Sequence, residues 1–402
     1  MDNLLGFTAI SIVCLITFFI GQRWPSVSKI LYFALGIRII VLLLGHYFFT
    51  LPDSTADAVS IEGQARFIAD NGLAFLINYY PGPGTQFIRW FLAIPYYFFG
   101  TSELMAKSIS LFFGIGSVFL GWKLAYKLWS NDVAHKVGWV IALFPSLILY
   151  SALTMRAVYI CFFLLVAIYG VVNWTQNKKI TSVCLAMAGF VAATFFHGAS
   201  MVGAITFIGI LTLVSINDFI KSLKNFRINL INLALLLLLS YLFMLYFSNE
   251  IFVPYVRDFQ FMTDPENLMR KTRHSVMGVA SYPDWTVVKS PNELIYKIPI
   301  RSIYFMFAPF PWDIKEAKHL IGMFDGFLFI YLTILILRNL KVIWKNLALR
   351  IIFLILITYV TVFAVGVGNF GTGIRHRSKF IIMFVLLAAP LITNFFSSKK
   401  NR

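Results

Sequence analysis

Charged residues are scarce in this chain. They make up 13% of its 402 residues, and hydrophobic residues make up 59%, whereas about a quarter of the residues of a soluble protein are charged. This composition excludes a water-soluble fold for most of the length. The net charge of +17 does not indicate nucleic-acid binding, because no basic soluble region exists to carry it. We expect the lipid bilayer to be the main surroundings of the chain.

Cysteine is also rare, and its positions exclude the usual cysteine chemistry. The three cysteines lie inside apolar stretches without metal-type spacing, which argues against a disulfide framework or a zinc site. Glycine-rich nucleotide-binding loops and internal repeats are missing too. Their absence argues against nucleotide-driven transport and against a soluble type of nucleotide-sugar enzyme.

Long apolar stretches dominate what is present. A helix needs about 18 or more apolar residues to cross a bilayer, and the segments that we expect to cross are 3–20, 30–51, 104–127, 135–153, 155–173, 180–196, 199–216, 229–248, 319–338, 350–368 and 378–396. Segment 86–100 is short and interrupted by proline, and it spans, re-enters or lies in the interface. The sequence predicts an all-α polytopic membrane protein with about 11–13 transmembrane helices, forming one integral-membrane domain over residues 1–402.

Lysine and arginine set the orientation, because short cytoplasmic loops carry an excess of both. Basic residues follow the spans at Arg23, Lys178, Lys221, Arg338 and Lys399, all on one side if segment 86–100 does not cross. The opposite side then holds residues 52–103, 249–318 and 369–377. We expect interfacial helices in the first of these outward loops.

Carboxylates gather in this first outward loop. Residues 52–81 form a polar island with Asp53, Asp57 and Glu62. Several acids at a membrane surface are candidates for general-base chemistry on a polar substrate, so these three are the candidate catalytic residues. The alternative for Asp57 is a solvated N-cap of the interfacial helix.

Cations form local clusters on the same predicted side. Guanidinium groups bind phosphate in a bidentate manner, and a glycine-rich turn can aim two of them at one anion. The candidate substrate-binding residues in these clusters are Arg270, Arg273 and His274 in the large loop, and Arg375, His376 and Arg377 before the last span. The alternative for the second cluster is a membrane-surface anchor.

Three more basic residues lie within or beside spans. Arg156 starts a span on the outward side and is a candidate for substrate binding. His197 lies at an outward turn, where it binds a sugar or phosphate or merely ends a helix. Arg38 lies within the second span, close enough to its end that we expect the side chain to snorkel to the interface.

The order of several short motifs resembles that of a known superfamily. Residues 56–66, followed by Gly72, resemble the first periplasmic loop of the C-type (GT-C) membrane glycosyltransferases, which include protein O-mannosyltransferases and the lipid A aminoarabinose transferase. Residues 80–83, 99–102 and 144–145, and the Gly-Thr-Gly-Ile-Arg-His-Arg run at 371–377, are similar to the same superfamily. Its second acid or aromatic is replaced here by Ala58 and Ile61, which leaves open whether Asp57 or Asp53 acts.

The resemblance implies a GT-C-like fold and a glycosyltransferase. The expected partners are a sugar donor linked to polyprenyl phosphate or pyrophosphate and a glycan or glycolipid acceptor, with Arg66 among the substrate-binding residues. The expected location is the bacterial inner membrane, with the active site on the periplasmic face. The use of a divalent metal, Mg²⁺ or Mn²⁺, stays open, and no other cofactor is expected.

Two alternatives remain beside this reading. The Pro-Phe-Pro-Trp run at 309–312 and the long loop 249–318 resemble bacterial O-antigen and capsule repeat-unit polymerases, which use pyrophosphate-linked oligosaccharides. The second alternative is a lipid-linked sugar flippase or another transporter. Transporters typically show internal repeats and charged residues near the bilayer centre, and neither is evident in this chain.

Overall fold

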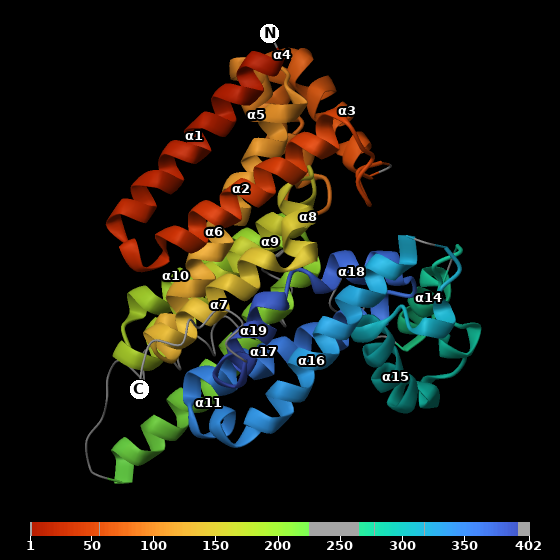
Figure 1. The fold of residues 1–402 in the computed structure, drawn as a ribbon. Coiled ribbons are helices and arrows are strands. Elements are labelled where there is room, and N and C mark those ends of the chain that lie inside the picture. Colours follow the sequence, from red (N-terminus) through yellow and green to blue (C-terminus); the bar gives the residue numbers. More distant parts are fainter. Residues whose placement is uncertain (1, 56, 225–264, 277, 317, 393–402) are drawn as a thin grey trace, which may run out of the picture.

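The chain folds into helices. The computed structural model describes residues 2–55, 57–224, 265–276, 278–316 and 318–392 (Figure 1). Within these ranges the β-type backbone pairing is limited to an isolated antiparallel bridge between Ser281 and Asn369. The all-α fold class expected from the sequence is therefore confirmed.

The structure has helices that can cross a bilayer. By length and apolar composition, seven helices of the described residues qualify, and an eighth crossing is made if α7 (Asn131–Leu143) and α8 (Pro145–Ser151) are one span bent by 60°. A multi-pass membrane protein follows from this count. The seven are α1 (Asp2–Arg23), α2 (Pro25–Tyr47), α6 (Glu103–Leu128), α9 (Arg156–Asn177), α11 (Met201–Lys224), α16 (Lys318–Lys345) and α17 (Leu347–Gly366).

Some expected spans differ from the observed helices. The segment expected at 180–196 is the 17-residue α10 (Ile180–Phe196), and 378–396 contains the short α19 (Ile381–Ala388). The segment expected at 229–248, like the first part of the large loop, lies outside the described residues. The total of about 11–13 spans therefore stays a prediction.

Glycines allow α9 and α10 to pack closely. A Cβ atom on Gly170 would lie 2.3 Å from the backbone nitrogen of Ala186, and one on Gly189 would lie 2.4 Å from that of Ala167. Small residues at helix crossings let backbones approach in this way, which strengthens packing where lipid offers no hydrophobic driving force. The pair forms a tight hairpin in the centre of the molecule (Figure 1).

The first outward loop forms three helices that do not cross the bundle. They are α3 (Asp57–Asp70), α4 (Gly72–Asn78) and α5 (Phe87–Phe99), and they lie together near the start of α1 (Figure 1). The Tyr150 hydroxyl at the end of α8 donates a hydrogen bond to Asp53, just after α2, so both chain positions lie at one end of the bundle. If α7 and α8 together make one crossing, α6 and this pair account for the two crossings between Asp53 and Tyr150, and α5 makes none.

The large loop and the last outward loop are joined by backbone bonds and by Arg301. The Tyr282 N–H donates to the Gly368 carbonyl at 2.8 Å, and the Phe370 N–H donates to the Ala280 carbonyl at 2.9 Å. Arg301 of α15 (Leu294–Phe307) is fully buried and donates to the Ala364, Val365 and Val367 carbonyls at the end of α17. Together with α14 (Pro265–Ser275), these segments form one cap (Figure 1).

Arg38 does not snorkel to the interface as expected. Its side chain is fully buried and donates to the Ala142 carbonyl at 2.8 Å, the Ile141 carbonyl at 3.2 Å and the Ser151 hydroxyl at 3.4 Å. Pro145 has no N–H for the Ile141 carbonyl, so the break between α7 and α8 leaves carbonyls that need a donor. The guanidinium group supplies the missing hydrogen bonds.

We predict that Arg38→Met destabilises the protein by about 2–5 kcal/mol, because buried carbonyls lose their donors. The apparent Tm of the purified protein in detergent measures the effect. Arg338→Met, which changes an exposed arginine on another span, is the matched control. Equal Tm values for both variants would show that the α7–α8 break does not need Arg38.

Candidate functional site

An ion pair between Asp57 and Arg375 joins the first and last outward loops across 318 positions of sequence. Asp57 begins α3, and Arg375 lies on α18 (Phe370–Arg377), whose first turn is capped by the Asn369 side chain. The Asp57 carboxylate is half exposed. Its pKa is lowered by the hydrogen bond from Arg375 and, more weakly, by the charges of Arg375, Arg156 and Arg89. Asp57 is therefore ionised and accessible at neutral pH.

Asp53 lies on the other side of Arg375. Its carboxylate accepts a hydrogen bond from the Tyr150 hydroxyl at 2.8 Å, and its charge acts on Arg375. The backbone φ of Asp53 is +61°, in the left-handed region that side chains other than glycine adopt at a cost. Such conformations are frequent at functional sites. Asp53 and Asp57 thus belong to one site. Tyr150, which was not predicted from the sequence, positions Asp53.

A second group of basic residues lies beside this pair. The His197 and His376 rings are in contact, with centroids 5.2 Å apart, and the Lys379 ammonium bonds the His376 Nδ1 atom at 2.6 Å. Burial and the charge of Lys379 hold the pKa of both histidines well below the ordinary value. The imidazoles are therefore neutral, and Arg156 carries a positive charge that acts on both rings. Burial lowers the pKa of Lys379 well below its ordinary value, and the charges of Arg156 and Arg375 lower it further.

Two buried nitrogen atoms of this group lack a hydrogen-bond partner within the described residues. They are Nη1 of Arg156 and Nδ1 of His197. Buried polar atoms are nearly always hydrogen-bonded, and exceptions are found at ligand and catalytic sites. Arg156 and His197, both candidates from the sequence, thus lie at the site. Each has a nitrogen atom without a hydrogen-bond partner among the described residues.

Arg377 does not share the site with Arg375, contrary to expectation. The 371–377 run forms a helix instead of an open turn, and side chains two positions apart on a helix point about 200° apart. Arg377 is fully buried and pairs with Asp325 at 2.9 Å. Its remaining donors bond the carbonyls of Met306, Ala308 and Gly322. These contacts occupy the guanidinium and give Arg377 a structural role.

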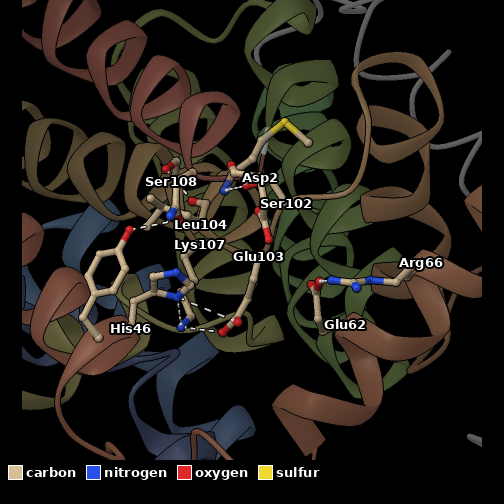
Figure 2. A network of polar contacts seen from close by, with 12 residues as sticks. Asp2, His46, Glu62, Arg66, Ser102, Glu103, Leu104, Lys107 and Ser108 are labelled. Carbon is tan, nitrogen blue, oxygen red and sulfur yellow. Dashed lines mark hydrogen bonds and ion pairs between the residues drawn. The ribbon is translucent and has the colours of Figure 1, made fainter.

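Glu62 and Arg66 belong to a separate polar network. Glu62 pairs with Arg66 at 3.4 Å and accepts a hydrogen bond from the Tyr96 hydroxyl of α5. Five positions on a helix separate Glu62 from Asp57 by about 140°, so the two carboxylates lie on different faces of α3. Figure 2 shows Glu62 and Arg66 beside a second group of polar contacts, formed by His46, Glu103 and Lys107.

The large-loop cluster contributes a different residue from those expected. Arg270, Arg273 and His274 are exposed on α14. Lys271 lies near Gly366 at the end of α17, and its charge acts on His197. Lys271 and Lys379 are therefore basic residues of the site that were not among the predicted phosphate ligands.

A metal site has no complete donor set within the described ranges. No three His, Cys, Asp or Glu side chains of these residues converge in the manner of metal ligands. Asp53 and Asp57 offer two carboxylates, both already near a guanidinium. The use of Mg²⁺ or Mn²⁺ stays a hypothesis.

Comparisons of the chain with protein-family models, with curated proteins and with solved structures find no match. The geometry of the site therefore carries the functional argument on its own.

We predict that Glu62→Gln flattens the pH dependence of stability. Burial raises the pKa of Glu62 above its ordinary value of 4.5. A carboxyl group whose pKa is higher in the folded chain binds its proton more tightly there, so the free energy of unfolding falls as pH rises from about 4.5 through the raised pKa. Glutamine keeps an acceptor for Tyr96 without the charge. The Tm of the wild type, relative to Glu62→Gln, should therefore fall as pH rises from about 4.5 through the raised pKa, and a constant difference would contradict this.

Arg375 and Arg377 should respond differently to the same substitution. Arg377→Met leaves the buried Asp325 unpaired, which costs about 3–5 kcal/mol, whereas Arg375→Met removes a partly exposed pair worth about 0–1 kcal/mol. We expect the apparent Tm to fall sharply for Arg377→Met alone. A similar loss in both variants would show that Arg375 is equally structural.

Proposed function

We propose that the protein is a membrane glycosyltransferase. It transfers a sugar from a polyprenyl-phosphate-linked or polyprenyl-pyrophosphate-linked donor to an acceptor hydroxyl of a glycan or glycolipid. The observation that supports the proposal most is the convergence of an ionised, accessible carboxylate, Asp57, with Arg375 and Arg156 at one end of the helices. This combination offers a base beside cations, as a transfer from a phosphate leaving group requires.

The proposed reaction assigns a role to each group. The acceptor hydroxyl attacks the anomeric carbon of the donor sugar, and the bond from that carbon to the phosphate oxygen breaks. The Asp57 carboxylate takes the hydroxyl proton, and the leaving phosphate keeps the electron pair. Arg375 and Arg156 bind the phosphate oxygens, where positive charge stabilises the charge that develops. Asp53, held by Tyr150, fixes the position of Arg375.

The proposed location of the site is the periplasmic face of a bacterial inner membrane. The end of α9 opposite Arg156 is followed by Lys178 and Lys179, and α16 ends at Lys345. Clusters of Lys and Arg favour the cytoplasmic side. The end that carries Asp57 and Arg375 then faces outward, where lipid-linked sugar donors are consumed.

A repeat-unit polymerase is a variant of the same chemistry. It would join two lipid-linked oligosaccharides and release polyprenyl pyrophosphate. The additional cations Lys271 and Lys379 favour this variant, because a pyrophosphate needs more positive charge than one phosphate. The two variants differ in the donor and share the proposed base.

We predict that Asp57→Asn lowers the transfer rate by about 10²-fold or more, the scale of losing a general base. The half-exposed carboxylate contributes little to packing, so expression and Tm should persist. Transfer is measured with purified protein in nanodiscs and a panel of synthetic polyprenyl-linked sugars. Asp70→Asn, at the other end of α3, is the control. Full activity in Asp57→Asn with loss in Asp53→Asn would assign the base to Asp53, and full activity in both would reject a carboxylate base here.

A further inference from the structure

The cations of the site differ in what neutralises them. Arg375 lies between two carboxylates, Asp57 and Asp53. Arg156 and Lys379 form no ion pair with a carboxylate within the described residues. The outer part of the site, one guanidinium and two carboxylates, therefore has a formal charge of −1, and the inner part holds two basic side chains without a carboxylate partner among the residues described.

Lys379 is the most telling member of the inner part. Its side chain is only 4% exposed, and its ammonium group contacts the neutral His376 ring and lies 5.0 Å from the Phe363 ring centre. A buried ammonium without a partner of opposite sign is costly, and burial accordingly lowers the pKa of Lys379 well below its ordinary value. A bound anion would stabilise the charged form of this side chain. Arg156, His197 and His376 beside it are partly exposed.

The donors of this group are positioned for an anion. When Lys379 is protonated, its ammonium donates to Nδ1 of His376, which places the ring proton on Nε2 and makes the free edge of the ring a donor. Nη1 of Arg156 and Nδ1 of His197 are buried without a partner in the described part of the chain. Guanidinium, ammonium and imidazole N–H groups together are typical ligands of phosphate.

We propose that Arg156, His197, His376 and Lys379 form a second anion subsite beside Arg375, and that the donor is a diphosphate. One phosphate binds Arg375 and the other binds this inner subsite. A sugar joined to a polyprenol by one phosphate carries a single negative charge, whereas the diphosphate-linked sugar carries two, which match Arg156 and Lys379. The inference rests on the proposed function and names its substrate class.

Binding of soluble analogues tests the inference directly. Farnesyl diphosphate and farnesyl monophosphate are titrated against the full chain in nanodiscs by calorimetry. We expect the wild type to bind the diphosphate at least tenfold more tightly, the scale of one charge-assisted contact. Inorganic pyrophosphate and phosphate, titrated in the same way, separate recognition of the phosphates from recognition of the lipid chain.

Variants locate the preference. Lys379→Met and Arg156→Gln should each reduce the preference for the diphosphate to about twofold or less. Lys107→Met is the matched control, because Lys107 is another largely buried lysine, paired with Glu103 outside the site. Should Lys379→Met fail to fold, Arg156→Gln at its partly exposed position carries the test alone. Equal affinity for both analogues in the wild type, or an unchanged preference in Arg156→Gln, would overturn the second subsite.

The outcomes separate this inference from the proposed function. A diphosphate preference without any Asp57-dependent transfer would keep the subsite and reject the glycosyltransferase. Asp57-dependent transfer from a monophosphate-linked sugar, with no preference between the farnesyl analogues, would keep the enzyme and reject the subsite.

Discussion

Backbone carbonyls that leave regular helices inside the protein need hydrogen-bond donors, because the membrane interior supplies no water. Three fully buried arginines meet this need. Arg38 serves the break between α7 and α8, Arg301 serves the end of α17, and Arg377 serves the chain between α15 and α16. Each guanidinium joins segments that are distant in sequence, so the end of the bundle that carries Asp57 and Arg375 holds a defined arrangement.

The same constraint separates structural from functional cations. A guanidinium whose donors are all bonded within the protein, as Arg377 is to the Asp325 carboxylate and to three backbone carbonyls, has nothing left for a substrate. Arg156 keeps a buried nitrogen without a partner, and Arg375 pairs with a carboxylate that solvent can reach. The arginines whose donors are all bonded thus hold in place the arginines whose donors are only partly used. Whether a guanidinium has donors left for a ligand distinguishes the two kinds better than its position along the chain.

Sequence reasoning reached the fold class, and it named Asp57 and Arg375 as separate candidates without their ion pair. Apolar stretches predict spans because the bilayer imposes their length, and Asp57 and Arg375 stood out as charges in outward loops. The partners of Arg38, Arg377 and Glu62 could not be predicted, because each depends on packing between distant segments. The separation of Arg375 from Arg377 was missed because Asn369 caps a helix where the glycines indicated a turn. Tyr150 and Lys379, which lie at the site, were not among the candidate site residues.

The Asp57–Arg375 pair also sets an order of events for the proposed reaction. Hydrogen bonding to Arg375 lowers the pKa of Asp57, and a carboxylate with a lowered pKa is a weaker base. A phosphate that binds Arg375 competes with Asp57 for the same donors and frees the carboxylate. Donor binding therefore precedes activation of the acceptor hydroxyl. Until a phosphate binds Arg375, the proposed base therefore stays weakened by its hydrogen bond to that guanidinium.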